Sequence, residues 1–399
     1  MKRLKKLSLL ILALVCALIL CACSNEAVSD GARETIEAPD VPTSPVQPEE
    51  PKDLDTRISF AAVGDMISYT GTIRDAKSCA VEGGRAYNFA PIFANVKHII
   101  EGADIAFINQ ETPLAGESYG YGSYPHFNTP RDLAYDIIEA GFDVVNLATN
   151  HMLDAGSNGL LDTLNFWRTL PVTTIGGYLD ESDLDNIRII EKDNVKIAFL
   201  SYTYSTNGYK LKSGYDIKIP YIDEALIERQ TKAANAIADL VFVSMHWGPE
   251  NNMTPNASQK DLARKMCSWG VDVILGHHPH VIQPIEWIEQ DGNRMLCAYS
   301  LGNFAAEQDH DYQLLGGLLT LDIVREDGEI FIDSPILHPT VYYYDKRFYK
   351  NSTYLFEDFT DAMAKSHGIS HYGRSITIER IRGYVEKTIS KEFLPQEWQ

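Results

Sequence analysis

Cysteine and basic residues are both scarce in this chain of 399 residues. Six cysteines with no Cys-x-x-Cys pair exclude a disulfide-stapled scaffold and a zinc ribbon. Lys and Arg number only 35 against 55 Asp and Glu, so the net charge is −20. That charge excludes nucleic acid as a partner, and it excludes docking on anionic lipid through a basic patch. The remaining composition, 45% apolar and 23% charged, is that of a globular chain long enough for a sizeable core.

The first 22 residues have the pattern of a secretory signal peptide. Four positive charges at positions 2, 3, 5 and 6 precede an apolar run over residues 7–22, which is short for a membrane span. The run ends in Leu20-Cys21-Ala22-Cys23, which resembles the bacterial lipobox, where cleavage occurs before a cysteine that receives a diacylglycerol. We therefore expect a protein anchored through lipid at Cys23 on the extracytoplasmic face of the cell membrane. An ordinary cleaved signal and an uncleaved anchor are the alternatives.

Residues 23–56 have the composition of a tether. Acids outnumber bases in this stretch, and proline recurs at every third position, at Pro39, Pro42, Pro45, Pro48 and Pro51. This spacing favours an extended polyproline II chain, which repulsion between like charges stiffens further. Cleavage before Cys23 would remove four positive charges and no acids, and would leave a mature charge of −24.

From residue 57 short apolar runs alternate with helical patterns. The apolar runs cover residues 58–63, 105–108, 144–148, 240–244, 271–275 and 295–299, and the main helical patterns cover 91–101, 131–140, 156–168, 225–238 and 256–269. This alternation predicts an α/β fold with largely parallel strands buried on both faces. After about residue 325 we expect a short hairpin that turns at Gly328, and terminal helices over 354–365 and 375–390. The predicted organisation is one domain over 57–345 with a helical extension, 346–399, packed on it.

Polar residues gather where the apolar runs end. The run ends supply Asp65, Glu111, Asn150, His151, His246, His278 and His280. In open α/β sheets ligands bind at the carboxyl ends of the strands, so these side chains should meet. With His151 set aside they form a nitrogen and oxygen donor set that suits two divalent ions, Mn, Fe or Zn, in a hydrolytic site. The cysteines Cys79, Cys267 and Cys297 lie in or beside apolar segments, and we expect them to be packing residues.

The same positions carry a family resemblance. The blocks are Val63-Gly64-Asp65-Met66, Asn109-Gln110-Glu111-Thr112-Pro113, Asn146 to Gly156 with Asn150-His151-Met152-Leu153-Asp154, His246-Trp247-Gly248-Pro249-Glu250, Gly276-His277-His278-Pro279-His280 and Tyr299-Ser300-Leu301-Gly302-Asn303-Phe304. Together they resemble the CapA/PgsA family of poly-γ-glutamate capsule synthesis proteins, over about residues 57 to 305. That family resembles the calcineurin-like metallophosphoesterases. The resemblance implies a metallophosphoesterase-like four-layer sandwich of two packed β-sheets flanked by helices.

The resemblance also implies roles for individual residues. Asp65, Glu111 and His280 would face one metal, and Glu111, Asn150, His246 and His278 would face the other. His151 would act as the acid or stabilise an oxyanion, with Asp154 as its orienting partner. The usual Asp-x-His of the phosphoesterases is missing, because Asp65 is followed by Met66 and Ile67. Either water or another group would complete the coordination of the first metal, or the site would hold one metal tightly and the other weakly.

Each of these residues also has a plainer interpretation. Asp65 and Glu111 could be turn residues, Asn150 could cap the helix that follows, and His246 could be an ordinary core histidine. His277 could contact the ligands or be one itself. We expect Glu250 and Asn303 to support the site or touch substrate, although Asn303 also suits a turn.

Two classes of function remain open from the sequence. One is a metal-dependent hydrolase or transferase outside the membrane, which acts on a phosphoester, an anionic cell-envelope polymer such as poly-γ-glutamate, or a γ-glutamyl amide. The other is a non-catalytic assembly or export factor that binds metal and partners the subunits of a polymer synthase. A solute-binding lipoprotein would share the anchor but would not need histidines at strand ends.

Overall fold

The computed structural model describes residues 55–399. The expected signal peptide, the lipidation residue Cys23 and nearly all of the expected tether lie outside the described residues. Strand β1 already begins at Thr56, one residue before the expected start of the domain. Within residues 55–399 no helix combines the length and the apolar character needed to cross a membrane.

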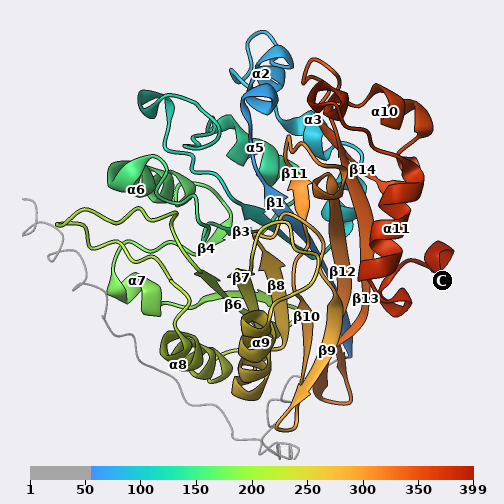
Figure 1. Cartoon of the computed structure of the whole chain (residues 1–399). Helices are drawn as coiled ribbons and strands as arrows, with labels where there is room; N and C mark the ends of the chain where they lie inside the picture. Colours follow the sequence, from blue (N-terminus) through green and yellow to red (C-terminus); the bar gives the residue numbers. More distant parts are fainter. Residues whose placement is uncertain (1–54) are drawn as a thin grey trace, which may run out of the picture. The chain divides into compact units, whose positions relative to one another are not determined.

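The first sheet has β1 near its centre (Figure 1). Its order is β14-β13-β12-β1-β2-β3-β4, and β11 pairs with the end of β1. The strands β1 to β4 run parallel, whereas β12, β13 and β14 form an antiparallel half. Their bounds are β1 (Thr56–Met66), β2 (Ile105–Gln110), β3 (Val144–Asn146), β4 (Thr173–Ile175), β11 (Asn303–Ala305), β12 (Leu315–Glu326), β13 (Glu329–Tyr343) and β14 (Ser352–Leu355).

The second sheet has the order β5-β6-β7-β8-β10-β9. The four central strands are parallel, and an antiparallel strand closes each edge. The bounds are β5 (Arg188–Lys192), β6 (Val195–Thr203), β7 (Leu240–His246), β8 (Val273–His277), β9 (Ile285–Gln290) and β10 (Asn293–Ala298). Every residue of β7 and β8 is buried, as the continuous apolar runs predicted.

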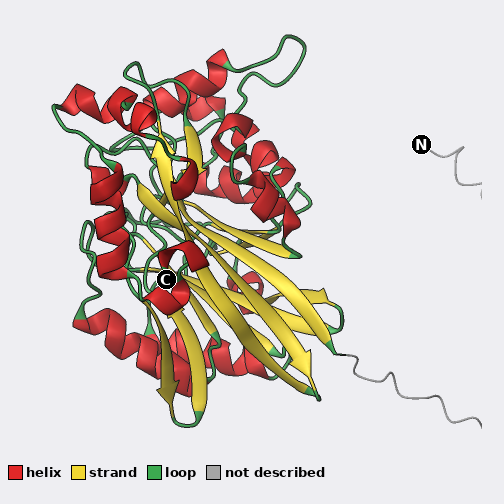
Figure 2. Ribbon diagram, turned by 90° about the vertical axis from the view of Figure 1, so that its right-hand side faces the viewer, coloured by secondary structure: helices red, strands yellow, loops and turns green. Residues whose placement is uncertain are grey.

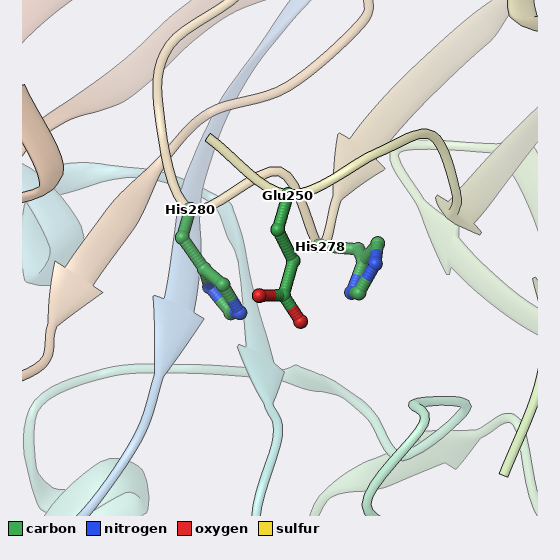
Figure 3. A group of neighbouring side chains, drawn as sticks. All are labelled: Glu250, His278 and His280. Atoms are coloured by element: carbon green, nitrogen blue, oxygen red, sulfur yellow. The ribbon is translucent and has the colours of Figure 1, made fainter. Parts of the chain in front are cut away.

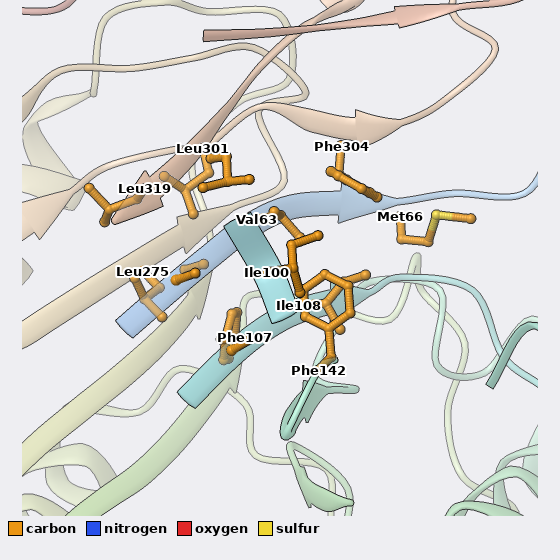
Figure 4. Close-up of a cluster of buried hydrophobic side chains, with 14 of the residues drawn as sticks. Val63, Met66, Ile100, Phe107, Ile108, Phe142, Leu275, Leu301, Phe304 and Leu319 are labelled. Carbon is orange, nitrogen blue, oxygen red and sulfur yellow. The ribbon is translucent and has the colours of Figure 1, made fainter. Parts of the chain in front are cut away.

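The two sheets pack face to face on aromatic and aliphatic side chains. Phe60 of β1 meets Phe242 of β7 edge to face, with ring centroids 5.1 Å apart. Phe242 belongs to the core between the sheets, whereas its neighbours Val241 and Val243 belong to a second core on the outer face. Figure 4 shows part of the large buried cluster around β1 and β2, including Val63, Phe107 and Leu275 of β8. Because successive residues of β7 alternate between the two cores, both faces of this strand are apolar and both must be covered.

Helices cover the outer faces of both sheets, as Figure 2 shows. Ile227 of α8 and Met266 of α9 pack on the outer core of the second sheet. The arrangement of two packed sheets flanked by helices confirms the expected fold class. The helix bounds are α2 (Thr70–Ser78), α3 (Ala90–Phe93), α4 (Lys97–Gly102), α5 (Asp132–Glu139), α6 (Gly156–Trp167), α7 (Glu181–Asp185), α8 (Glu224–Asn235), α9 (Ala257–Trp269), α10 (Asp361–Ser366) and α11 (Ile378–Thr388).

Three expected elements differ in the structure. The hairpin does turn at Asp327-Gly328, both with positive φ, but its strands β12 and β13 are long and start before residue 325. The expected helix over 354–365 is wrong in its first part, because β14 continues the sheet to Leu355. The expected helix over 91–101 is split into α3 and α4.

Candidate metal centre

The predicted side chains meet where the carboxyl ends of the two sheets' parallel strands converge. Asp65 lies at the end of β1, Glu111 directly follows β2, and His246 ends β7. The loop after β8 brings His278 and His280 to the same place. All of these are buried, as are Asn150 and His151 from the loop after β3. The rule that ligands bind at strand ends therefore located the cluster correctly.

The carboxylate of Glu111 lies at the centre of three imidazoles. Its Oε1 is 3.7 Å from Nε2 of His280, 3.8 Å from Nε2 of His246 and 3.9 Å from Nε2 of His151. These separations are too long for hydrogen bonds. Both oxygens of Glu111 are buried, and neither accepts a hydrogen bond from any residue in the range 55–399. Burial raises the pKa of Glu111 well above its usual range.

Asp65, in contrast, has its oxygens well supplied with donors. Oδ1 accepts from the Nδ2 of Asn109 at 2.7 Å, and Oδ2 accepts from the backbone N–H of His278 at 3.2 Å. Nδ1 of His280 is 3.1 Å from Oδ2. Burial alone would raise the pKa of Asp65, but the neighbouring imidazoles of His277 and His280 bring that pKa well below its usual range. Asp65 therefore remains a carboxylate at the floor of the site.

His246, Asn150 and His278 form the side of the cluster next to the second sheet. The Nε2 of His246 lies 2.8 Å from Oδ1 of Asn150. The Nδ1 of His278 is buried and has no hydrogen-bond partner among the described residues. Burial lowers the pKa of His246, and burial together with His280 lowers that of His278 to about 3. Both imidazoles are therefore neutral at pH 7, the state in which a ring nitrogen can hold a metal.

His280 is held from behind by Asn303. The Nδ2 of Asn303 donates to the backbone carbonyls of His280 and Gln313, which leaves its Oδ1, 3.1 Å from Nδ1 of His280, as an acceptor. Nδ1 must then be the N–H, and Nε2 faces the centre of the site. Burial alone would lower the pKa of His280, but the carboxylates of Glu111 and Asp65 raise it to about 10. In the metal-free protein a proton therefore occupies Nε2, and a metal would displace it.

His151 stands beside the cluster with Asp154 as its partner. Its Nδ1 lies 2.7 Å from Oδ2 of Asp154, and that same oxygen accepts from the backbone N–H of Phe127 at 2.9 Å. The ring of Phe127 meets His151 edge to face at 4.8 Å. The imidazole is thus fixed with Nε2 directed at Glu111. This geometry suits a proton donor next to the site more closely than a plain core histidine.

His277 lies beneath the site rather than in it. Its ring is fully buried and stacks on Phe107, with centroids 5.7 Å apart. Nδ1 is 3.3 Å from Oδ1 of Asp65, but the ring is not aligned for a hydrogen bond. His277 therefore contacts the candidate ligand Asp65, and both of its ring nitrogens lack a hydrogen-bond partner among the described residues.

Glu250 reaches the cluster from the loop after β7. Figure 3 shows its carboxylate between the rings of His280 and His278. One ligand atom from each of the three residues lies within 4.8 Å of the others, and Asp65, Glu111 and His246 form a second such group. Unlike the others, Glu250 is exposed to solvent. It lines a cleft of about 310 Å³ above the site.

The donor set fits divalent metal. Buried polar groups are normally paired, so unpaired oxygens on Glu111 and an unpaired Nδ1 on His278 call for a partner. A cation at the centre of the cluster would supply one, because carboxylate, amide and imidazole donors suit Mn, Fe and Zn. The sulfur atoms take no part, since Cys267 and Cys297 are buried in the outer core of the second sheet.

Some residues of the site were not singled out from the sequence. A hydrogen-bonded chain runs from Ser201 of β6 to Asn146 and on to Asn109, which holds Asp65. Asn109 and Asn146 are paired across β2 and β3 at the end of two apolar runs, so the same strand-end signal could have found them. The ring of Tyr204 has its centroid 4.4 Å from that of His278. No sequence motif marks this tyrosine.

Comparison with known proteins gives three findings. The model of the bacterial capsule synthesis protein PGA_cap matches residues 59–308. The chain is 29% identical over 290 residues to the capsule biosynthesis protein CapA of Bacillus anthracis, an alignment that covers 69% of this chain and 66% of that protein. It is 34% identical over 221 residues to the PGA biosynthesis protein CapA of Bacillus subtilis (strain 168), covering 54% of this chain and 57% of that one.

The matched part of the chain spans less than two thirds of the length of either Bacillus relative. Among solved structures, the calcineurin-like phosphoesterase YfkN from Bacillus subtilis superposes with a TM-score of 0.46 at 15% identity. That superposition covers 82% of this chain and 100% of the YfkN chain.

Proposed function

The chain belongs to the PGA_cap family of bacterial capsule synthesis proteins, and from this premise we propose that it serves poly-γ-glutamate capsule biosynthesis through a metal-dependent, hydrolase-like site. In this proposal it is anchored by lipid at Cys23, works on the extracytoplasmic face of the cell membrane, and meets the subunits that synthesise or export the polymer. The names of the two Bacillus relatives support the capsule role. The cluster around Glu111 supports the chemistry.

One observation carries the metal part of the proposal. Glu111 is fully buried between two sheets, both of its oxygens lack a donor, and three imidazole nitrogens surround it at 3.7–3.9 Å. A buried carboxylate without partners costs a few kcal/mol, so a purely structural role would leave the fold with an uncompensated penalty. Divalent ions bound by Glu111 together with Asp65, Asn150, His246, His278 and His280 would remove that penalty.

The same arrangement supports hydrolysis. A bound divalent ion would polarise an acyl or phosphoryl oxygen and lower the pKa of bound water. His151 would protonate the leaving group, because its Nε2 faces the cluster and Asp154 fixes the ring. Such a site can cleave a phosphoester or an amide, and the lining of the cleft favours the second.

The cleft above the site is lined by tyrosine, amide and acidic side chains. Its walls include Tyr69, Tyr124, Gln308 and Gln313, and no Lys or Arg is among the residues that line it. Phosphoryl groups are usually held by basic side chains, so this lining suits a chain of amide groups better than a row of phosphates. One carboxylate of poly-γ-glutamate would meet the metal, while an amide of the polymer would meet Gln308.

Glu111→Gln tests the proposal, with Glu117→Gln on the exposed surface as the matched control. The full chain carrying Glu111→Gln should lose most of its bound Mn, Fe or Zn by elemental analysis, and it should fail to restore capsule to a deletion strain. The control should retain both properties. Wild-type protein that contains no stoichiometric metal, together with full capsule yield from Glu111→Gln, would contradict the proposal.

The same experiment separates catalysis from assembly. Ile67 stands where the phosphoesterase pattern has a histidine, so the first metal has one nitrogen fewer than usual. If the wild-type protein holds metal but cleaves neither poly-γ-glutamate nor a model phosphodiester, the second function applies. The site would then bind metal to grip the polymer, without reaction, in an assembly or export complex.

A further inference from the structure

We propose that Glu250 is itself a metal ligand, which completes a site with His278 and His280. This inference rests on the proposed metal function and changes its grouping of donors: Glu250 would share one metal with His278 and His280, while Asp65, Glu111 and His246 form the other group. The ligand would be a divalent cation of the Mn, Fe or Zn class, held by one carboxylate and two imidazoles.

The geometry places three donors around one point. A carboxylate oxygen of Glu250 and one nitrogen each from His278 and His280 lie within 4.8 Å of one another, and Figure 3 shows the carboxylate between the two rings. His278 is only 2% exposed, and its Nδ1 finds no hydrogen-bond partner in the described part of the chain. His280 has its other nitrogen engaged by Asn303, so Nε2 is the one directed at the site. Two buried nitrogens thus face the same exposed acid.

The loop that carries Glu250 is fixed to the loop that carries the histidines. The backbone N–H of Asn251 donates to the carbonyl of Pro279 at 2.8 Å. The side chain of Asn251 also accepts from Gln313 Nε2 at 2.6 Å. Asn251, the neighbour of Glu250 in the chain, is therefore fixed to both the loop after β8 and Gln313, which limits where Glu250 can lie.

Two buried glutamines extend the support into helix α9. Gln283 donates to the carbonyl of Asn252 at 2.7 Å, and it accepts from Gln259 Nε2 at 3.0 Å. Gln259 is the third residue of α9 and forms a reciprocal capping box with Asn256. Gly248 lacks a side chain at the point where a Cβ would lie 2.6 Å from the Gln259 amide. The segment from 248 to 252 is thus positioned by contacts that do not involve Glu250 itself.

The position of Ile67 gives the reason for an extra acid. Ile67, Glu250 and His280 all line the same cleft. Ile67 packs with Phe127 and Ala306 and has no donor atom to offer a metal. A carboxylate that enters from the loop after β7 adds a donor on this side of the cleft, where Ile67 offers none. Because this donor is oxygen rather than nitrogen, it would favour Mn over Zn.

The test is a titration of the metal-free full chain with Mn²⁺, followed by calorimetry and by the electron paramagnetic resonance of bound Mn²⁺. Glu250→Gln keeps the shape but loses the charge, and it should weaken one Mn²⁺ binding event by about 10- to 100-fold or more, since even residues that only contact ligands have effects of that size. Glu289→Gln on strand β9 is the control with the same change, and it should bind as wild type does. Glu250→His should restore one binding event with Zn²⁺ preferred over Mn²⁺.

The outcomes separate the two proposals. Wild-type Mn²⁺ affinity and stoichiometry in Glu250→Gln, together with loss of binding in Glu111→Gln, would overturn the role of Glu250 and leave the metal centre standing. A Glu250→His variant that behaves as Glu250→Gln does with both metals would also count against Glu250 as a ligand. If the wild-type chain binds no Mn²⁺, Fe²⁺ or Zn²⁺, both proposals fail. Because Glu250 is exposed, its variants should unfold at the wild-type temperature when no metal is present, and that measurement shows that the fold is intact.

Discussion

At the scale of single residues, the centre differs from an ordinary buried ion-pair cluster in how its hydrogen bonds are distributed. Asp65 is surrounded by donors, whereas Glu111 at the middle has none. His280 follows the same division, because its outer nitrogen is engaged by Asn303 and its inner nitrogen is not. His246 has the reverse arrangement, with Nε2 bonded to Asn150 and Nδ1 unpaired. At Glu111 and His280, then, the atoms that face the centre are open, which is the pattern expected of a site that binds an ion.

His151→Ala should separate chemistry from metal binding. The imidazole faces Glu111 but is oriented by Asp154, so its loss should leave the metal content and the fold unchanged. Any hydrolytic rate should fall by about 10²- to 10⁴-fold, the usual span for a general acid. The measurements are metal content and rate on the same preparation, with His98→Ala on the exposed side of α4 as the control.

A different result for His151→Ala would change the assignment. Metal lost together with activity would make His151 a ligand. Full activity with metal retained would leave it a structural histidine that Asp154 happens to hold.

Residues at the ends of apolar runs could be predicted from the sequence because strand ends share one edge of a sheet. Asp65, Glu111, His246, His278 and His280 all followed this rule. Tyr204 could not be predicted, because its place beside His278 depends on how the loop after β6 folds back. The sequence could not decide between a turn role for Asn303 and a role beside the site. The structure shows its side-chain oxygen next to Nδ1 of His280.

At the scale of elements, the end of β1 is held by close backbone contact. The pairing of β1 with β2 shifts register between Val63 and Asp65, and Gly64 stands at the shift. A Cβ on Gly64 would lie 1.9 Å from the carbonyl oxygen of Gly302, and the N–H of Asp65 donates to that same oxygen at 2.9 Å. The position of Asp65 in the site therefore depends on a strand approach that only glycine permits.

Gly64→Ala should destabilise the protein strongly. Neither backbone can yield without moving β1 or the loop before β11, so we expect a loss of about 2–4 kcal/mol in the free energy of unfolding. Urea denaturation measures it. Gly102→Ala in α4, where a Cβ would meet nothing within 4 Å, should change stability by less than about 1 kcal/mol. Equal stability of the two variants would show that the strand end is not rigid.

Another prediction at this scale concerns the contact between Glu307, which follows β11, and Thr72 of α2. The Glu307 side chain, which accepts from Thr72 Oγ1 at 2.7 Å, is only 8% exposed, and burial raises its pKa to about 7. The folded state then keeps a proton that the unfolded chain releases above its usual pKa near 4.5, so the free energy of unfolding falls as pH rises from about 4.5 to 7. The contribution is about 2–3 kcal/mol over that window.

Glu307→Gln removes this titration, so its stability should depend less on pH between 4.5 and 7 than that of the wild type. The comparison is made by urea denaturation at several pH values. An unchanged slope would mean that Glu307 is ionised in the folded protein across the whole range.

The sequence predicted the parallel strands β1, β2, β3, β7, β8 and β10, but it missed the parallel strands β4 and β6 and most of the antiparallel borders. The runs that became β1, β2, β7 and β8 are continuous and apolar, because helices cover one face and the other sheet covers the second. Strand β5, by contrast, has no fully buried residue, and it shows no apolar run that would mark it. The expected helix over 354–365 takes in the last two residues of β14, because the pairing of β14 with β13 is a tertiary contact that local pattern cannot reveal.

At the scale of the whole molecule, negative charge limits how the protein could bind poly-γ-glutamate, the polymer of the proposed function. A chain with a net charge of −20 should repel polyglutamate at a distance. No Lys or Arg is among the residues that line the cleft. Any binding to the polymer must therefore be local and depend on bound metal, and salt should strengthen it by screening the repulsion.

Cys23→Ser tests the proposed attachment of the molecule to the membrane. The thiol would be the acylated group, so the variant should no longer incorporate labelled fatty acid and should leave the membrane fraction. Both are measured after fractionation of cells, with Cys79→Ser as the control. Continued labelling and membrane association of Cys23→Ser would rule out the lipid anchor at this residue.

The hydrogen bond from the backbone of His278 to the carboxylate of Asp65 joins positions that are 213 residues apart. A chain emerging from the ribosome or from a secretion channel would expose Asp65 long before its partners exist. The centre can form only after both sheets are complete and docked, so metal capture should be the last event of maturation. Occupancy of the site would then report a finished fold, and a truncated or stalled chain would leave its donors open to whatever ions surround it.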